Sequence, residues 1–97
     1  MENIFEIIDK TGRKIYLSKE RWSHIRKKHP EVEDYEQIEQ SIKNPDKITD
    51  YSLDETIGYY YKYFKHRHSP SKYLFVLVKY LNGIGYVITA YFEDKIK

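Results

Sequence analysis

The stretch from Tyr73 to Phe92 constrains the fold of this chain most strongly. Residues 73–80 (YLFVLVKY) are apolar on both alternating faces, which is the pattern of a central strand in a sheet. Asn82-Gly83 follows, and this dipeptide is typical of a tight hairpin turn. Residues 86–92 (YVITAYF) supply the returning strand. The C-terminal part of the chain is therefore predicted to be antiparallel sheet.

Shorter strands are predicted in the rest of the chain. They lie at 3–8, 14–17, 47–52 and 57–65. The first two form a short hairpin, in which Gly12 provides the positive φ that such turns need. Residues 53–56 are predicted to be a turn, and the Ser-Pro-containing residues 66–71 a polar loop.

Two helices are predicted between the hairpin and the later strands. Ser18 is a good N-cap for a helix over residues 19–28, which Pro30 brings to an end. Asp34 caps a second helix, with Gln37 at the capping-box position. This order predicts an α+β fold, with two N-terminal helices packed on a curved antiparallel sheet of about four strands, preceded by a short hairpin.

Composition indicates one intracellular domain spanning residues 1–97. Leu, Ile, Val and Phe make up 25 of the 97 residues, enough for a packed core. No apolar run approaches the length of a membrane span, and the N-terminus lacks the pattern of a signal peptide. Because a small secreted domain often needs disulfides and this chain has no cysteine, we expect a cytoplasmic location and no membrane partner.

Charge and tyrosine content indicate a polyanion as partner. Residues 1–30 carry 8 basic and 4 acidic side chains, residues 31–58 carry 2 and 9, and residues 59–97 carry 7 and 2. Two basic segments that met in the fold would make a positive patch, although ordinary solvated faces would have the same composition. Eleven of the sixteen aromatic residues are tyrosine, which suits base stacking and equally suits half-buried strands.

Metal and cofactor chemistry is poorly supported by the sequence. His24 and His29 are five residues apart, which turns them roughly 140° from each other on a regular helix. His66 and His68 fall in the predicted loop without a nearby carboxylate. The glycines and serines match neither a nucleotide-binding fingerprint nor a nucleophile elbow. We expect no metal site and no cofactor.

The remaining polar residues suit the cleavage of RNA, which carries its own 2′-hydroxyl nucleophile. Histidine can move the protons, and Lys or Arg can stabilise the charge that develops on phosphorus. His24 shares a helix side with Arg21, Lys27 and Lys28, neighbours that favour its neutral form and hold anions close. It could equally be a surface histidine on a solvated helix. His29 falls on the inward stripe, where a capping or core role competes with function.

Candidates from the predicted strands and loop also have two interpretations each. Lys79 ends an apolar strand and either contacts phosphate or only snorkels from the strand end. Thr89, predicted to share a face with Val87 and Tyr91, is either a phosphate ligand or a good strand former. Arg67 could clamp phosphate or do nothing.

Several segments together resemble a group of nucleases. They are WSHIRKKHPE (22–31), IKNPDKI (42–48), GYYYKYF (58–64), FVLVKY (75–80) and GYVITAYF (85–92). In their order and spacing they are similar to the phage- and toxin-associated barnase–EndoU–colicin–RelE-like superfamily. The resemblance implies a metal-independent ribonuclease with a helical layer against a curved antiparallel sheet, often a toxin with a cognate antitoxin protein. It points to His24 in the helix and to Thr89 or Tyr91 in the last strand, with Lys79 and Tyr60 as companions.

These observations give a working hypothesis of a toxin-type endoribonuclease acting on RNA. The residues expected to take part in catalysis are His24, Lys79, Thr89 and Tyr91. Those expected to bind substrate are Arg21, Lys27, Lys28, His29, Tyr60, Lys62 and Arg67. His24 is predicted on the outer side of its helix, so it can reach a cleft only if that helix lies at the edge of the sheet. The alternatives are a nucleic-acid binder without catalysis and an inactive toxin-like protein-interaction module.

Overall fold

The computed structural model describes residues 2–51 and 53–96, which form one sheet and two helices. The elements are β1 (Asn3–Ile8), β2 (Lys14–Ser18), α1 (Lys19–Lys28), α2 (Tyr35–Lys43), β3 (Lys47–Tyr51), β4 (Asp54–Tyr63), β5 (Tyr73–Leu81) and β6 (Ile84–Glu93). The predicted positions of both helices and of the strands are confirmed to within a few residues. The turn predicted at 53–56 is shorter, since β4 begins at Asp54, and Ser52 lies outside the described residues.

The predicted four-stranded antiparallel sheet with a separate hairpin is wrong. The structure has a six-stranded mixed sheet in the order β1-β2-β6-β5-β4-β3. The N-terminal hairpin joins it because β2 runs parallel to β6, pairing Lys14 with Ile84 and Tyr16 with Tyr86. Alternation in β2 buries Ile15 and Leu17 completely. That pattern predicts a strand but carries no information about which distant strand it will pair with.

Both helices begin with the side-chain caps that the sequence predicts. The Ser18 Oγ accepts a hydrogen bond of 3.0 Å from the backbone N–H of Arg21 at the start of α1. At α2, Asp34 and Gln37 form a reciprocal capping box. These caps satisfy backbone donors that have no partner inside the helix, and so they fix where each helix starts.

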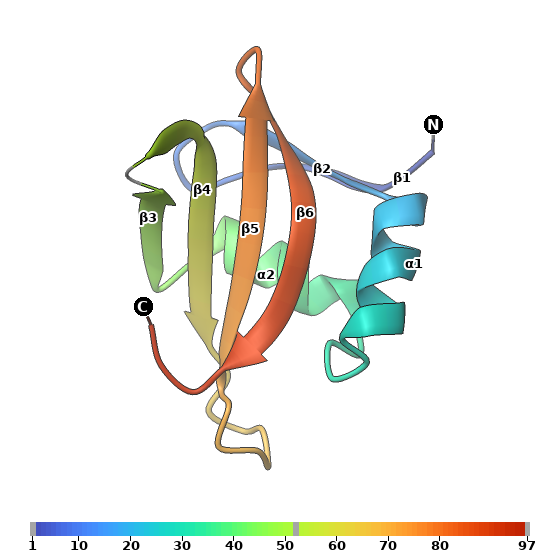
Figure 1. Ribbon diagram of the computed structural model, residues 1–97, viewed down its shortest axis with the longest axis vertical. Helices are drawn as coiled ribbons and strands as arrows, with labels where there is room; N and C mark the ends of the chain where they lie inside the picture. Colours follow the sequence, from blue (N-terminus) through green and yellow to red (C-terminus); the bar gives the residue numbers. More distant parts are fainter. Residues whose placement is uncertain (1, 52, 97) are drawn as a thin grey trace.

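The two helices occupy different places around the sheet. Helix α2 crosses behind β4 and β5, and its Ile38 and Ile42 are fully buried in the core. Helix α1 lies instead beside β6, at the edge of the sheet (Figure 1). The core packs between the sheet and α2 and continues under the β1–β2 hairpin. Its members on the sheet include Ile15, Leu17, Tyr60, Leu74, Val76, Val78, Val87 and Ala90.

The front face of the sheet carries a row of aromatic rings. In the described part of the chain, no helix or strand lies over it (Figure 1). The Phe75 ring lies 5.1 Å from that of Tyr59, 5.4 Å from Tyr61 and 5.0 Å from Tyr91, measured between centroids. Tyr61 and Phe75 are only 2% and 6% exposed, because neighbouring rings cover them. Much of the tyrosine content therefore forms a packed layer in the sheet itself.

Candidate active site between α1 and β6

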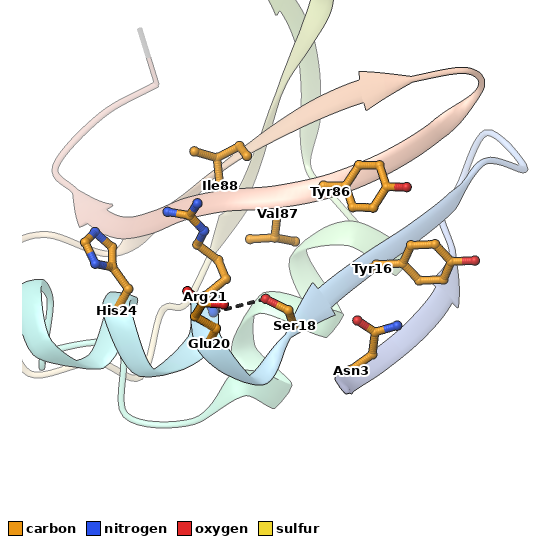
Figure 2. Close-up of a pocket in the computed structure, with 9 residues that line it drawn as sticks. All are labelled: Asn3, Tyr16, Ser18, Glu20, Arg21, His24, Tyr86, Val87 and Ile88. Carbon is orange, nitrogen blue, oxygen red and sulfur yellow. Dashed lines mark hydrogen bonds between the residues drawn. The ribbon is translucent and has the colours of Figure 1, made fainter. Parts of the chain in front are cut away.

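Helix α1 presents Arg21 and His24 to a pocket. Helical spacing places Ile25 toward the core and turns Arg21, His24 and Lys28 to the other side of the helix. Because α1 lies at the edge of the sheet, this outward side forms one wall of a pocket of about 710 Å³. The condition for His24 to reach a cleft is thus met. In Figure 2 the guanidinium of Arg21 extends from α1 toward Ile88 of β6, and the His24 ring lies beside it.

The opposite wall of the pocket comes from the sheet. Tyr86, Val87 and Ile88 of β6 line it, together with Tyr16 of the parallel strand β2 and Asn3 of β1. The Tyr16 and Tyr86 rings lie 5.7 Å apart between centroids at an angle of 52°. Figure 2 shows these two rings at the end of the pocket away from His24. The pocket therefore has a cationic, imidazole-bearing end and an aromatic end.

A β-bulge in β6 changes the expected orientation of Thr89. Leu77 of β5 pairs with Thr89, but Val78 pairs with Val87, so Ile88 is an extra residue. Val87 points into the core, while Thr89 lies on the same sheet face as Tyr91. The prediction that Thr89 and Val87 share a face is wrong for this reason. Because of the bulge, Ile88 reaches the pocket and Thr89 follows it on the uncovered face.

His29 reaches the same strand further along. It is the C-cap of α1, with φ −133° and ψ 69°, so its side chain no longer follows the helical spacing. Its ring lies 5.2 Å from that of Tyr91 between centroids, and its Nδ1 lies 3.6 Å from Glu31 Oε2. We call the line formed by Arg21, His24 and His29 on one side and Tyr86, Ile88 and Tyr91 on the other the α1–β6 seam.

Two predicted substrate-binding residues, Tyr60 and Lys62, lie on the opposite face of the sheet from Tyr59 and Tyr61. Tyr60 is fully buried and cannot offer a stacking surface. Lys62 donates a hydrogen bond of 2.9 Å to the carbonyl of Asn44, the C-cap of α2. The run of tyrosines gave no indication of which alternate set would face the helices.

Four other predicted cations have their own partners or stay in solvent. The Lys79 Nζ lies 2.6 Å from Thr56 Oγ1 and 3.3 Å from Asp54 Oδ2. Hydrogen bonds from Thr56, and then the Lys79 charge, hold the pKa of the Asp54 carboxyl below its usual value. Arg67 stacks on Phe92, 3.6 Å from its ring centroid, and donates to the carbonyl of Ser71. Lys27 and Lys28 are exposed on α1.

A second polar cluster, which we call the Asp9 network, lies under the β1–β2 turn. The buried Asp9 carboxylate accepts hydrogen bonds from the Tyr60 hydroxyl at 2.5 Å and from the backbone N–H of Arg13 at 2.8 Å. The Tyr60 hydroxyl also lies 2.6 Å from that of Tyr80. Tyr80 crosses Gly58 so closely that a Cβ there would lie 2.5 Å from its hydroxyl oxygen. These contacts hold the hairpin against the sheet.

The ionisation of the Asp9 network follows from its burial. Burial raises the pKa of Asp9, but hydrogen bonds from Tyr60, Arg13 and Thr11 outweigh it, and the pKa falls below its usual value. Burial, and then the hydrogen bond to Asp9, raises the pKa of Tyr60. The network therefore combines an ionised carboxylate with neutral hydroxyls, and its polar groups satisfy one another.

Three residues of the candidate site were not predicted from the sequence: Tyr16, Tyr86 and Glu31. Tyr16 points outward in the alternation of β2, but only the parallel pairing brings it to Tyr86. Glu31 directly follows His29-Pro30, and this nearness along the chain was the one available signal.

Among residues 2–51 and 53–96, no three His, Asp or Glu side chains gather as a metal site would require. Neither described helix is long and apolar enough to span a bilayer.

Comparison with known proteins adds no relative. No protein family, no curated protein and no solved structure matches this chain. The resemblance to the nuclease superfamily is therefore one of sequence motifs alone.

Proposed function

We propose that the chain is a cytoplasmic, metal-independent endoribonuclease of the toxin type, with its active site at the α1–β6 seam. The observation that carries the proposal is the pocket that Arg21 and His24 share with the Tyr16–Tyr86 pair. A guanidinium binds a phosphate oxygen, an imidazole exchanges protons near neutral pH, and aromatic faces stack nucleobases. Together these three groups could hold and cleave a ribonucleotide chain.

The reaction is transesterification within the RNA. The 2′-oxygen loses its proton to His24 and forms a bond to phosphorus, the bond from phosphorus to the 5′-oxygen breaks, and a 2′,3′-cyclic phosphate remains. Arg21, with Lys28 one turn after His24, stabilises the charge on the phosphorane. Thr89 or Tyr91 on the uncovered face holds a phosphate oxygen. Since Lys79 is bound to Asp54 and Thr56, it is not assigned this role.

Cleavage of labelled RNA by wild type and His24→Ala, in the presence of EDTA, tests the proposal. We expect His24→Ala to lose about 10²–10⁴-fold in rate while its thermal midpoint is unchanged, because the exposed ring contributes little to the core. The products of wild type should end in a cyclic phosphate. His68→Ala, an exposed loop histidine outside the seam, is the matched control and should cleave normally.

Arg21→Ala tests the phosphate contact that the guanidinium provides. It should weaken RNA affinity and reduce the slope of log affinity against log salt by about one, as loss of one phosphate contact does. Full cleavage by His24→Ala would contradict the proposed mechanism. Salt-dependent binding without any cleavage by wild type would indicate a nucleic-acid binder, and absence of both would leave a protein-interaction module.

A further inference from the structure

The proposed reaction needs a second proton-transfer group, since the departing 5′-oxygen must gain a proton when the 2′-hydroxyl loses one. We propose that His29 is this group and acts as the general acid opposite His24. This inference rests on the proposed function and assigns a second role at the same seam. The sequence alone predicts a binding, capping or core role for His29.

The backbone explains how His29 comes to the seam. On a continued helix its ring would be turned roughly 140° from that of His24. Pro30 disfavours helical geometry at the preceding residue, and His29 accordingly has φ −133° and ψ 69°, outside the helical region. Its N–H still donates to the carbonyl of Ile25 at 2.7 Å, so the backbone is fixed while the ring turns toward Tyr91.

The ring is held on two sides and remains accessible. Tyr91 packs against it at an angle of 35°, and Glu31 Oε2 lies 3.6 Å from Nδ1. Because the Glu31 carboxylate lies on the Nδ1 side of the ring, we assign proton exchange with the substrate to Nε2. The His29 side chain is 31% exposed, so water and substrate can reach it.

Two arginines fix the loop that carries Glu31. Arg26 donates from the same guanidinium nitrogen to the carbonyls of Pro30, at 2.6 Å, and Val32, at 2.9 Å. Arg67 approaches the carbonyl of Glu31 at 3.4 Å. Arg67, predicted to bind substrate, thus supports the residue that contacts His29. Such pre-formed support is what a positioned acid–base group needs.

The positions of the two histidines allow a division of labour. Five residues separate them, which places their backbones about 7.5 Å apart along the axis of α1. Positive charge from Arg21, Lys27 and Lys28 gathers on the His24 side, where the phosphate would bind. Glu31 and the carbonyl end of α1 place negative charge beside His29.

In one cleavage, His24 gains one proton and His29 loses one, so the number of protons is conserved. His24 takes the 2′-hydroxyl proton as the 2′-oxygen bonds to phosphorus. His29 gives the Nε2 proton to the 5′-oxygen as its bond to phosphorus breaks. The products are a cyclic phosphate and a 5′-hydroxyl, and each imidazole returns to its starting state by exchange with water.

The experiment compares two leaving groups. One substrate set is ribodinucleotides, whose 5′-alkoxide needs a proton to depart. The other is the ribonucleoside 3′-(4-nitrophenyl phosphates) with each of the four bases, whose phenolate departs without one. We expect His29→Asn to lower the rate on dinucleotides by about 10²–10³-fold and on the aryl esters by less than about fivefold. His24→Ala should lose activity on both.

Glu31→Gln provides a second variant that leaves the imidazole in place. It should lose about tenfold on dinucleotides and little on the aryl esters, and it keeps the inference testable if His29→Asn does not fold. Full dinucleotide activity of His29→Asn, or equal losses on both substrates, would overturn the role of His29 while leaving the ribonuclease proposal intact. If wild type cleaves neither substrate, both proposals fail.

Discussion

The Asp9 network and the α1–β6 seam contain similar side chains, but these side chains have different roles. In the network, Asp9, Arg13, Tyr60 and Tyr80 are packed against one another, and the Asp9 side chain is completely buried. In the seam, His24 is exposed and the His29 side chain is 31% exposed. The difference is access to water. Polar groups that satisfy each other away from solvent hold the fold, whereas groups left facing solvent are available to a ligand.

The largest expected contrast is between Asp9→Ala and Arg21→Ala. Asp9→Ala leaves the buried Tyr60 hydroxyl and the Arg13 charge without their acceptor, and should lower the free energy of unfolding by about 3 kcal/mol. Arg21→Ala should change it by less than about 0.5 kcal/mol. Urea unfolding followed by tyrosine and tryptophan fluorescence measures both. Equal losses in the two variants would remove the distinction between the regions.

Acid should weaken the Asp9 network before it affects packing elsewhere. The folded-state pKa of Asp9 lies below its unfolded value, so its contribution is fully present above the unfolded pKa of about 4 and is lost as pH falls through the folded pKa. The urea concentration at the unfolding midpoint of wild type should therefore decrease as the pH is lowered through this acidic range. Asp9→Asn cannot titrate there, so its midpoint should depend less on pH. If the urea midpoints of wild type and Asp9→Asn depended on pH in the same way, other carboxyl groups would be responsible for the loss of stability in acid.

The smallest effect is expected for Lys79→Ala. Its ammonium pairs with Asp54 at a partly exposed site, and such pairs contribute between 0 and about 1 kcal/mol. Because Lys79 already has these partners, RNA cleavage should fall less than about threefold, far less than for His24→Ala. A hundredfold loss of cleavage rate in Lys79→Ala would instead indicate that Lys79 takes part in catalysis.

Local patterns in the sequence predicted the elements well, but not the sheet. Ser18, Asp34 and Asn82-Gly83 act on the backbone next to them, so the helix starts and the last turn could be read directly. The parallel pairing of β2 with β6 joins segments about seventy residues apart in the chain, and no local rule selects it.

The candidate site was predicted in part for the same reason. Helical spacing gave the side of α1 that carries Arg21 and His24, because both lie on one regular element. The position of Thr89 depended on the bulge at Ile88, which the sequence does not reveal. Tyr60 lies in a run of tyrosines with rings on both faces, so alternation alone could not tell which ones would be buried. Residues joined by tertiary pairing, such as Tyr16 and Tyr86, were missed.

The shortness of β2 has a consequence for association between molecules. β2 pairs with β6 only from Ile84 to Tyr86, and beyond this the flank of β6 lies beside α1 in the described chain. Exposed backbone donors and acceptors on a strand attract strands from other molecules. Helix α1 thus shields a part of β6 that could otherwise recruit a neighbour. Substitutions that loosen α1, such as removal of the Ser18 cap, should promote intermolecular strand addition as well as unfolding.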